Sequence, residues 1–183
     1  MKIHLFLVAL LGAVPAYAQD APNWLSEPAP IASIRLAEPA ADEAVVVIND
    51  NALGGNHAGL FAGDRLIDPA GSYFGVRGED KTWPGPTLAD YARYQTTDGI
   101  KVRFYRFRLT PDAMAQLRQR IADAGPTPPL FCAAAVQNLL VDIAPFEAIT
   151  RTGFTTPTAL GKRLDALVTH GVGECQQLDA SPC

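Results

Sequence analysis

Residues 43–69 read EAVVVINDNALGGNHAGLFAGDRLIDP, and this stretch decides the fold. Its β-branched start, Glu43–Ile48, is typical of a buried strand. Turn-forming residues separate that run from two further short runs, His57–Ala62 and Arg65–Asp68, which are joined by a glycine-containing pair typical of a hairpin. The stretch therefore predicts three consecutive antiparallel strands, and His57 lies on the middle one.

The remainder of the chain is predicted to be mostly helical. Met114, Leu117 and Ile121 recur at the spacing of one buried helical stripe. Strands first and helices afterwards, without regular alternation, favour the α+β class. We expect a loop at 69–86, a helix at 87–95, a strand at 100–109, and helices that begin at Thr110, Cys132 and Thr156.

The chain begins with the features of an exported protein. A basic start, an apolar run over Leu5–Val14 and an Ala-x-Ala site predict a signal peptide at 1–18. No later apolar run is long enough to cross a membrane, so the mature protein is expected to be periplasmic or secreted. The predicted order is signal peptide, extended Pro- and Ala-rich lead-in at 19–43, one domain at 44–170 and a short tail at 171–183.

The charge and the cysteine content limit the classes of function that the protein can have. The formal net charge is −4 and the basic residues form no cluster, which argues against nucleic acid as a partner. An exported chain meets an oxidising compartment, and three cysteines leave one thiol over. Cys175 and Cys183 are close in sequence and are predicted to form a disulfide, which leaves Cys132 free. The alternative is that Cys132 pairs with one of them.

Cys132 is the candidate nucleophile. Residues 127–140 read TPPLFCAAAVQNLL, which predicts a short approach followed by a cysteine in the first turn of an apolar helix. First-turn N–H groups and the helix dipole favour a thiolate at such a position. The alternative is that Cys132 is a small buried hydrophobic residue, which is the commoner role of a free cysteine.

His57 and Asp68 complete a candidate triad. A strand histidine is suited to act as the base for a thiol, although it could equally be a core or edge residue. Asp68 lies eleven positions after His57 in the sequence, at the end of the neighbouring predicted strand, where its carboxylate could meet the imidazole. An Asp-Pro turn is the alternative role for Asp68. Weaker candidates for the third position are Asn49, Asp50 and Asn56.

Neither a metal nor a cofactor is predicted. The other histidine of the expected mature chain, His170, follows the end of a helix, where a histidine usually interacts with the helix dipole. The sequence has no Cys-x-x-Cys or His-x-x-x-His spacing and no glycine-rich phosphate-binding motif. We therefore expect a site built from side chains alone.

The same residues resemble a known family. Asn56–Phe61 on one strand, Asp68–Tyr73 at the end of the next, and the cysteine helix Phe131–Leu140 are similar to the circularly permuted papain-like branch of the NlpC-type superfamily. Lecithin:retinol acyltransferase and several bacterial amidohydrolases belong to that branch, in which the histidine strand precedes the cysteine helix, as it does here. Phe131 and Ala133 differ from the Asn and Ser/Thr that many members place beside the cysteine.

The resemblance covers about residues 44–170 and implies a small antiparallel sheet, or partial barrel, packed against helices. It also implies that Cys132 is the nucleophile, that His57 is the base and that the third member is a polar residue at or near Asp68.

Together these observations predict an exported thiol hydrolase or acyltransferase that acts on an amide. The export signal makes cell-wall peptide, a part of peptidoglycan, the candidate substrate. One alternative is a non-catalytic envelope binding or assembly protein on the same fold, and another is a lipid-acyl hydrolase or transferase. Tyr73 and Trp83, in the loop at 69–86, are candidates for lining the cleft.

Overall fold

A computed structural model describes residues 36–178 and 181–183. The predicted signal peptide at 1–18 and most of the predicted lead-in lie outside these residues. The described part belongs to the α+β class, as predicted, and contains an antiparallel sheet that stays open and does not close into a barrel.

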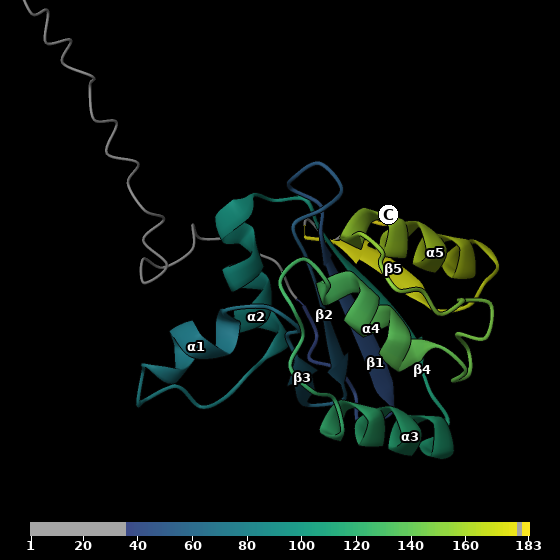
Figure 1. Cartoon of the computed structure of the whole chain (residues 1–183), viewed down its shortest axis with the longest axis horizontal. Helices are drawn as coiled ribbons and strands as arrows, with labels where there is room; N and C mark the ends of the chain where they lie inside the picture. The colour runs from purple at the N-terminus through teal and green to yellow at the C-terminus, as the bar shows by residue number, and fades with distance from the viewer. Residues whose placement is uncertain (1–35, 179–180) are drawn as a thin grey trace, which may run out of the picture.

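The sheet has five strands in the order β3-β2-β1-β4-β5, and every neighbouring pair is antiparallel (Figure 1). The central position of β1 explains its sequence, because a strand with neighbours on both sides and helices on both faces is buried along its length. The first three strands confirm the predicted hairpins. The strands are β1 (Glu43–Asn49), β2 (His57–Ala62), β3 (Arg65–Ile67), β4 (Val102–Arg108) and β5 (Glu174–Gln177).

Threonine caps begin three of the helices. The side chains of Thr87, Thr110 and Thr156 each accept a hydrogen bond from the N–H three residues later. The helices are α1 (Tyr73–Gly78), α2 (Leu88–Gln95), α3 (Pro111–Ala122), α4 (Cys132–Leu140) and α5 (Pro157–Thr169), with a 3₁₀ turn η1 at Thr96–Asp98.

Two elements correct the sequence-based expectation. Helix α1 lies inside the segment 69–86, which the sequence predicts to be a loop throughout. Strand β5 lies inside the predicted tail 171–183, where it pairs with β4 and extends the sheet.

Helices cover both faces of the sheet. On one face, α3, α4 and α5 pack on alternate residues of β1 and β2, including Val46, Ile48 and Leu60 (Figure 1). On the other face, α2 packs on the intervening residues, including Val47 and Phe61. Because successive side chains of a strand point to opposite faces of the sheet, β1 and β2 each contribute apolar residues to both layers.

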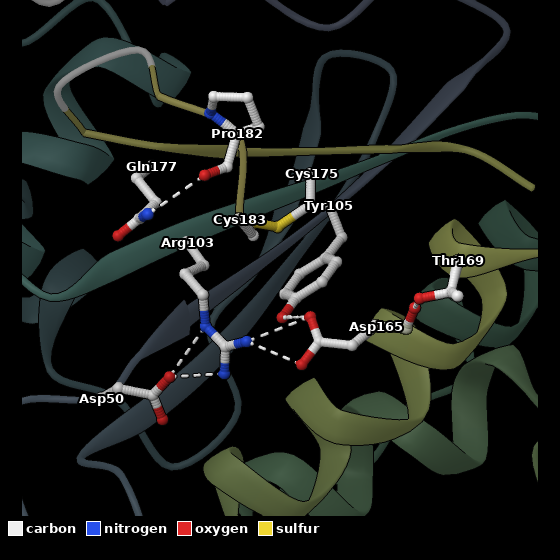
Figure 2. Close-up of a disulfide and its surroundings, with 9 residues drawn as sticks. All are labelled: Asp50, Arg103, Tyr105, Asp165, Thr169, Cys175, Gln177, Pro182 and Cys183. Carbon is white, nitrogen blue, oxygen red and sulfur yellow. Dashed lines mark hydrogen bonds and ion pairs between the residues drawn. A yellow bond between two sulfur atoms is a disulfide. The ribbon is translucent and has the colours of Figure 1, made fainter. Parts of the chain in front are cut away.

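An ion-pair cluster fixes the turn that leads into β2. Arg103 of β4 donates from Nε to Asp50 Oδ2 over 2.9 Å and from Nη1 to Asp165 of α5 over 3.0 Å (Figure 2). Asp50 also accepts from Thr158 Oγ1, and Asp165 from the Tyr105 hydroxyl. The cluster holds β4, the start of α5 and the chain just after β1 together, so the turn delivers His57 to a defined place.

The predicted disulfide joins Cys175 of β5 to Cys183, with their Cα atoms 5.5 Å apart (Figure 2). Cys132 is the free cysteine of the described residues. Among residues 36–178 and 181–183, no helix is long and apolar enough to cross a membrane.

We expect Cys183→Ser to lower the free energy of unfolding by about 2 kcal/mol, because the bond closes a short loop that must otherwise be ordered on folding. Urea unfolding of the variant and the wild type measures the difference. Alkylation of Cys132 should be unchanged, since the bond lies away from the thiol. Non-reducing peptide mapping that links Cys132 to either partner would contradict this pairing.

Candidate active site

Cys132 is the first residue of α4, and α4 packs on β2. The preceding residue, Phe131, makes no side-chain capping hydrogen bond, so the first-turn N–H groups are not occupied by a cap. The backbone N–H groups of Ala133 and of Ala58 instead lie close enough to the sulfur of Cys132 to lower its pKa. Strand β3 pairs with β2 only over Leu60–Ala62, which leaves the backbone at Ala58 open to the sulfur.

His57 begins β2 and lies between a carboxylate and the thiol. Its Nε2 lies 2.6 Å from Asp68 Oδ1, and its ring lies close enough to the Cys132 side chain for each group to shift the pKa of the other. Because Nε2 is engaged by Asp68, Nδ1 is the nitrogen left for the sulfur. The three predicted residues therefore meet in the order carboxylate, imidazole, thiol.

Asp68 is held by more than the imidazole. Its Oδ1 also accepts a 2.6 Å hydrogen bond from the Tyr91 hydroxyl, and its Oδ2 accepts from the backbone N–H of Tyr73 over 3.2 Å. The carboxylate is 1% exposed and the His57 side chain 15% exposed. A buried carboxylate with three partners stays in one orientation, which fixes the ring of His57.

Two glycines make this arrangement possible. A Cβ on Gly59 would lie 2.2 Å from the hydroxyl oxygen of Tyr91, so only glycine lets α2 bring that hydroxyl over β2 to Asp68. A Cβ on Gly71 would lie 1.9 Å from Asp68 Oδ2, because the chain after β3 wraps around the carboxylate.

The charges of the pair support each other. Burial acts to lower the pKa of His57, but hydrogen bonds and charge from Asp68 and Cys132 outweigh it and raise the pKa to about 9. Burial acts to raise the pKa of Cys132, but the His57 imidazolium and the two backbone N–H groups lower it. Both directions favour a thiolate–imidazolium pair over a neutral thiol and imidazole.

The structure places the weaker candidates as follows. Asn49 is buried and donates to Gln95, and Asp50 belongs to the Arg103 cluster. His170 follows the end of α5. Asn56 is exposed and lines a cavity next to His57.

That cavity has a volume of about 250 Å³ and borders His57 and Asp68. Most of its lining residues have polar side chains, and Asp98 brings a carboxylate that has no hydrogen bond or ion pair with any described side chain. Tyr73 and Trp83, which the sequence suggests as cleft-lining residues, do not line this cavity. The remaining wall residues are Asn56, Ala70, Gly71, Ser72, Tyr94, Gln95 and Thr97.

Sequence reasoning missed Tyr91, whose hydroxyl completes the support of Asp68. Tyr91 fits the apolar pattern of α2 and gives no separate signal, although Gly59 indicates that some element approaches β2 closely. Within residues 36–178 and 181–183, no group of three or more His, Cys, Asp and Glu side chains is arranged to hold a metal ion.

Comparisons of the chain with protein-family models, curated proteins and solved structures give no match. Function is therefore inferred from the geometry of this site.

Proposed function

We propose that this protein is an exported cysteine hydrolase or acyltransferase that acts on an amide. The observation that carries the proposal is that Asp68, His57 and Cys132 meet: Asp68 is hydrogen-bonded to His57, His57 and Cys132 shift each other's pKa, and the thiol lies at an uncapped helix start. A merely structural cysteine needs neither an imidazole nor two backbone N–H donors at its sulfur.

In the proposed first step, the Cys132 thiolate attacks the substrate carbonyl, and the carbonyl oxygen takes the negative charge. First-turn N–H groups of α4 are placed to stabilise that oxyanion. The intermediate collapses when the carbon–nitrogen bond breaks and His57 gives its proton to the departing amine. An acyl thioester remains on Cys132.

In the second step, His57 takes a proton from water, and the resulting hydroxide oxygen attacks the thioester. The carbon–sulfur bond breaks, the carboxylic acid leaves, and the thiolate–imidazolium pair is restored. An acceptor amine or alcohol in place of water would give acyl transfer. Asp68 keeps Nδ1 of His57 directed at the sulfur throughout.

We further propose that the fold is the circularly permuted papain-like one. The order of the histidine strand before the cysteine helix supports this, as does the open antiparallel sheet against which that helix packs. The disulfide between Cys175 and Cys183 is compatible with an oxidising compartment, so cell-wall peptide is the substrate class we favour.

The test is to trap the thioester. Wild-type protein is mixed with short acyl-peptide amides and with cell-wall peptide fragments, and intact-mass spectrometry follows the adduct. We expect one acyl group on Cys132 and release of the amine, with neither in Cys132→Ala. Amine release that persists in Cys132→Ala, or no adduct and no release with any amide, would overturn the proposal.

A further inference from the structure

Large apolar side chains are exposed directly beside the thiol. Leu130 is 81% exposed, Phe131 is 38% exposed and Phe154 is 57% exposed. The rings of Phe131 and Phe154 meet edge to face with their centroids 5.5 Å apart. We call these three residues the apolar rim. Phe131 immediately precedes Cys132, so the rim is continuous with the nucleophile.

Buried polar contacts hold the segment that carries Phe154. The fully buried Gln137 of α4 donates from Nε2 to the Thr150 carbonyl over 2.6 Å and to Thr152 Oγ1 over 3.1 Å. Arg163 of α5 donates to Thr155 Oγ1 over 3.0 Å. The chain on both sides of Phe154 is therefore fixed to two helices, and the exposed ring is presented from a supported backbone.

The backbone conformation of Leu130 is unfavourable as well. Its φ is 72°, a left-handed conformation that is unfavourable for a leucine. The side chain gains no burial in return. Strain and exposure together, next to the proposed nucleophile, point to a role in contact with a ligand.

The chemistry of the site orients that ligand. His57 must give a proton to the departing amine, so the amine lies on the His57 side, where mostly polar residues line the neighbouring cavity. The acyl group then lies away from His57, and the apolar rim, which adjoins Cys132 in the chain, offers it an apolar surface.

We infer that the apolar rim is the acyl-side subsite, and that it takes an alkyl or aryl group attached near the scissile carbonyl. This inference rests on the proposed function. The apolar group could be a peptide side chain or a fatty acyl chain, which share this chemistry and differ in length.

Maleimides with methyl, benzyl, hexyl and dodecyl substituents test the subsite, because each alkylates Cys132 and differs only in its apolar part. Rates are divided by those with N-acetylcysteine to remove intrinsic reactivity. We expect benzyl and hexyl reagents to react about tenfold faster than methyl with the wild type, since burial of the group assists the approach. A rate that rises again with dodecyl indicates a fatty acyl chain, and a plateau at benzyl or hexyl indicates a side chain.

Phe154→Ala should abolish the preference for the benzyl and hexyl reagents over the methyl reagent. Ile100→Ala, which removes another exposed apolar side chain, is the matched control and should keep the preference. Equal normalised rates for all reagents in the wild type, or a preference that survives in Phe154→Ala, would overturn the subsite. Slow reaction with every reagent, as in the unfolded chain, would instead count against the activated thiol of the proposed function.

Discussion

Replacing His57 with alanine is expected to slow alkylation of Cys132 by iodoacetamide about 10- to 100-fold in mildly acidic buffer. An ordinary thiol has a pKa of about 8.5, so only about 1% is thiolate two pH units below that value. In the wild type the imidazolium of His57 lowers the pKa of Cys132, so a larger fraction of the sulfur is thiolate at that pH. A thiolate of low pKa is also a weaker nucleophile, so the difference in alkylation rate is smaller than the difference in thiolate fraction.

His170→Ala is the matched control for this experiment, because His170 lies at the end of α5 and has no part in the site. Its alkylation rate should equal that of the wild type. Asp68→Asn should give an intermediate rate, since the amide holds the ring of His57 but supplies no charge. Equal rates for His57→Ala and the wild type would remove His57 from the site.

Replacing Gly59 with alanine is expected to lower the free energy of unfolding by about 2–3 kcal/mol, as overpacking of a buried site does. The new Cβ would lie 2.2 Å from the Tyr91 hydroxyl oxygen. Tyr91 cannot withdraw easily, because its ring is fully buried and packs edge to face on Phe61 and Tyr73. Urea denaturation measures the loss.

Gly75→Ala is the matched control, because a Cβ at Gly75 in α1 meets nothing within 4 Å. That substitution should leave stability unchanged or raise it by about 0.5–1 kcal/mol through helix propensity. In Gly59→Ala, alkylation of Cys132 should also slow, since displaced Tyr91 no longer supports Asp68. Equal stabilities of the two variants would contradict the close approach of α2 to β2.

Much of the fold could be predicted because its signals are local. The β-branched run of β1 and the caps Thr87, Thr110 and Thr156 each act within a few residues. Strand β5 could not be predicted, because its sequence, Glu-Cys-Gln-Gln, has no apolar alternation. Pairing with β4 and the bond from Cys175 to Cys183 hold it in place.

Helix α1 was missed for a similar reason. Its sequence contains two glycines and its N-cap makes no side-chain hydrogen bond, so local propensity does not favour a helix. Long-range contacts stabilise it instead. Tyr73 is buried and donates from its hydroxyl to Asp90 of α2, and Arg77 donates to the same carboxylate.

Some residues of the candidate site could likewise be predicted from local sequence, and others could not. Cys132, His57 and Asp68 could be found from residue type and from their places at the ends of elements, and the structure brings them together. The part that Tyr91 plays could not, because nothing in the sequence says which helix crosses Gly59. A small residue in a strand indicates that another element approaches the strand closely there. Which element that is depends on tertiary packing, which the local sequence does not reveal.

The pKa directions set a pH window for turnover. The lowered pKa of Cys132 extends the thiolate to lower pH than in an ordinary thiol, and the raised pKa of His57 keeps the imidazolium up to about pH 9. Turnover should therefore be bell-shaped, falling in acid as the thiolate is protonated and above about pH 9 as His57 loses the proton needed by the leaving amine. Alkylation needs only the thiolate, so it should fall in acid and persist in alkali.

The ultraviolet absorbance of the thiolate tests the central claim most directly. The difference spectrum between the wild type and Cys132→Ser isolates this sulfur, because the other two cysteines are joined in the disulfide. The account predicts that the thiolate band is present at neutral pH, disappears only as the solution is made acidic, and is lost at neutral pH in His57→Ala. A band that emerges only at or above the pKa of an ordinary thiol, about 8.5, would contradict the account.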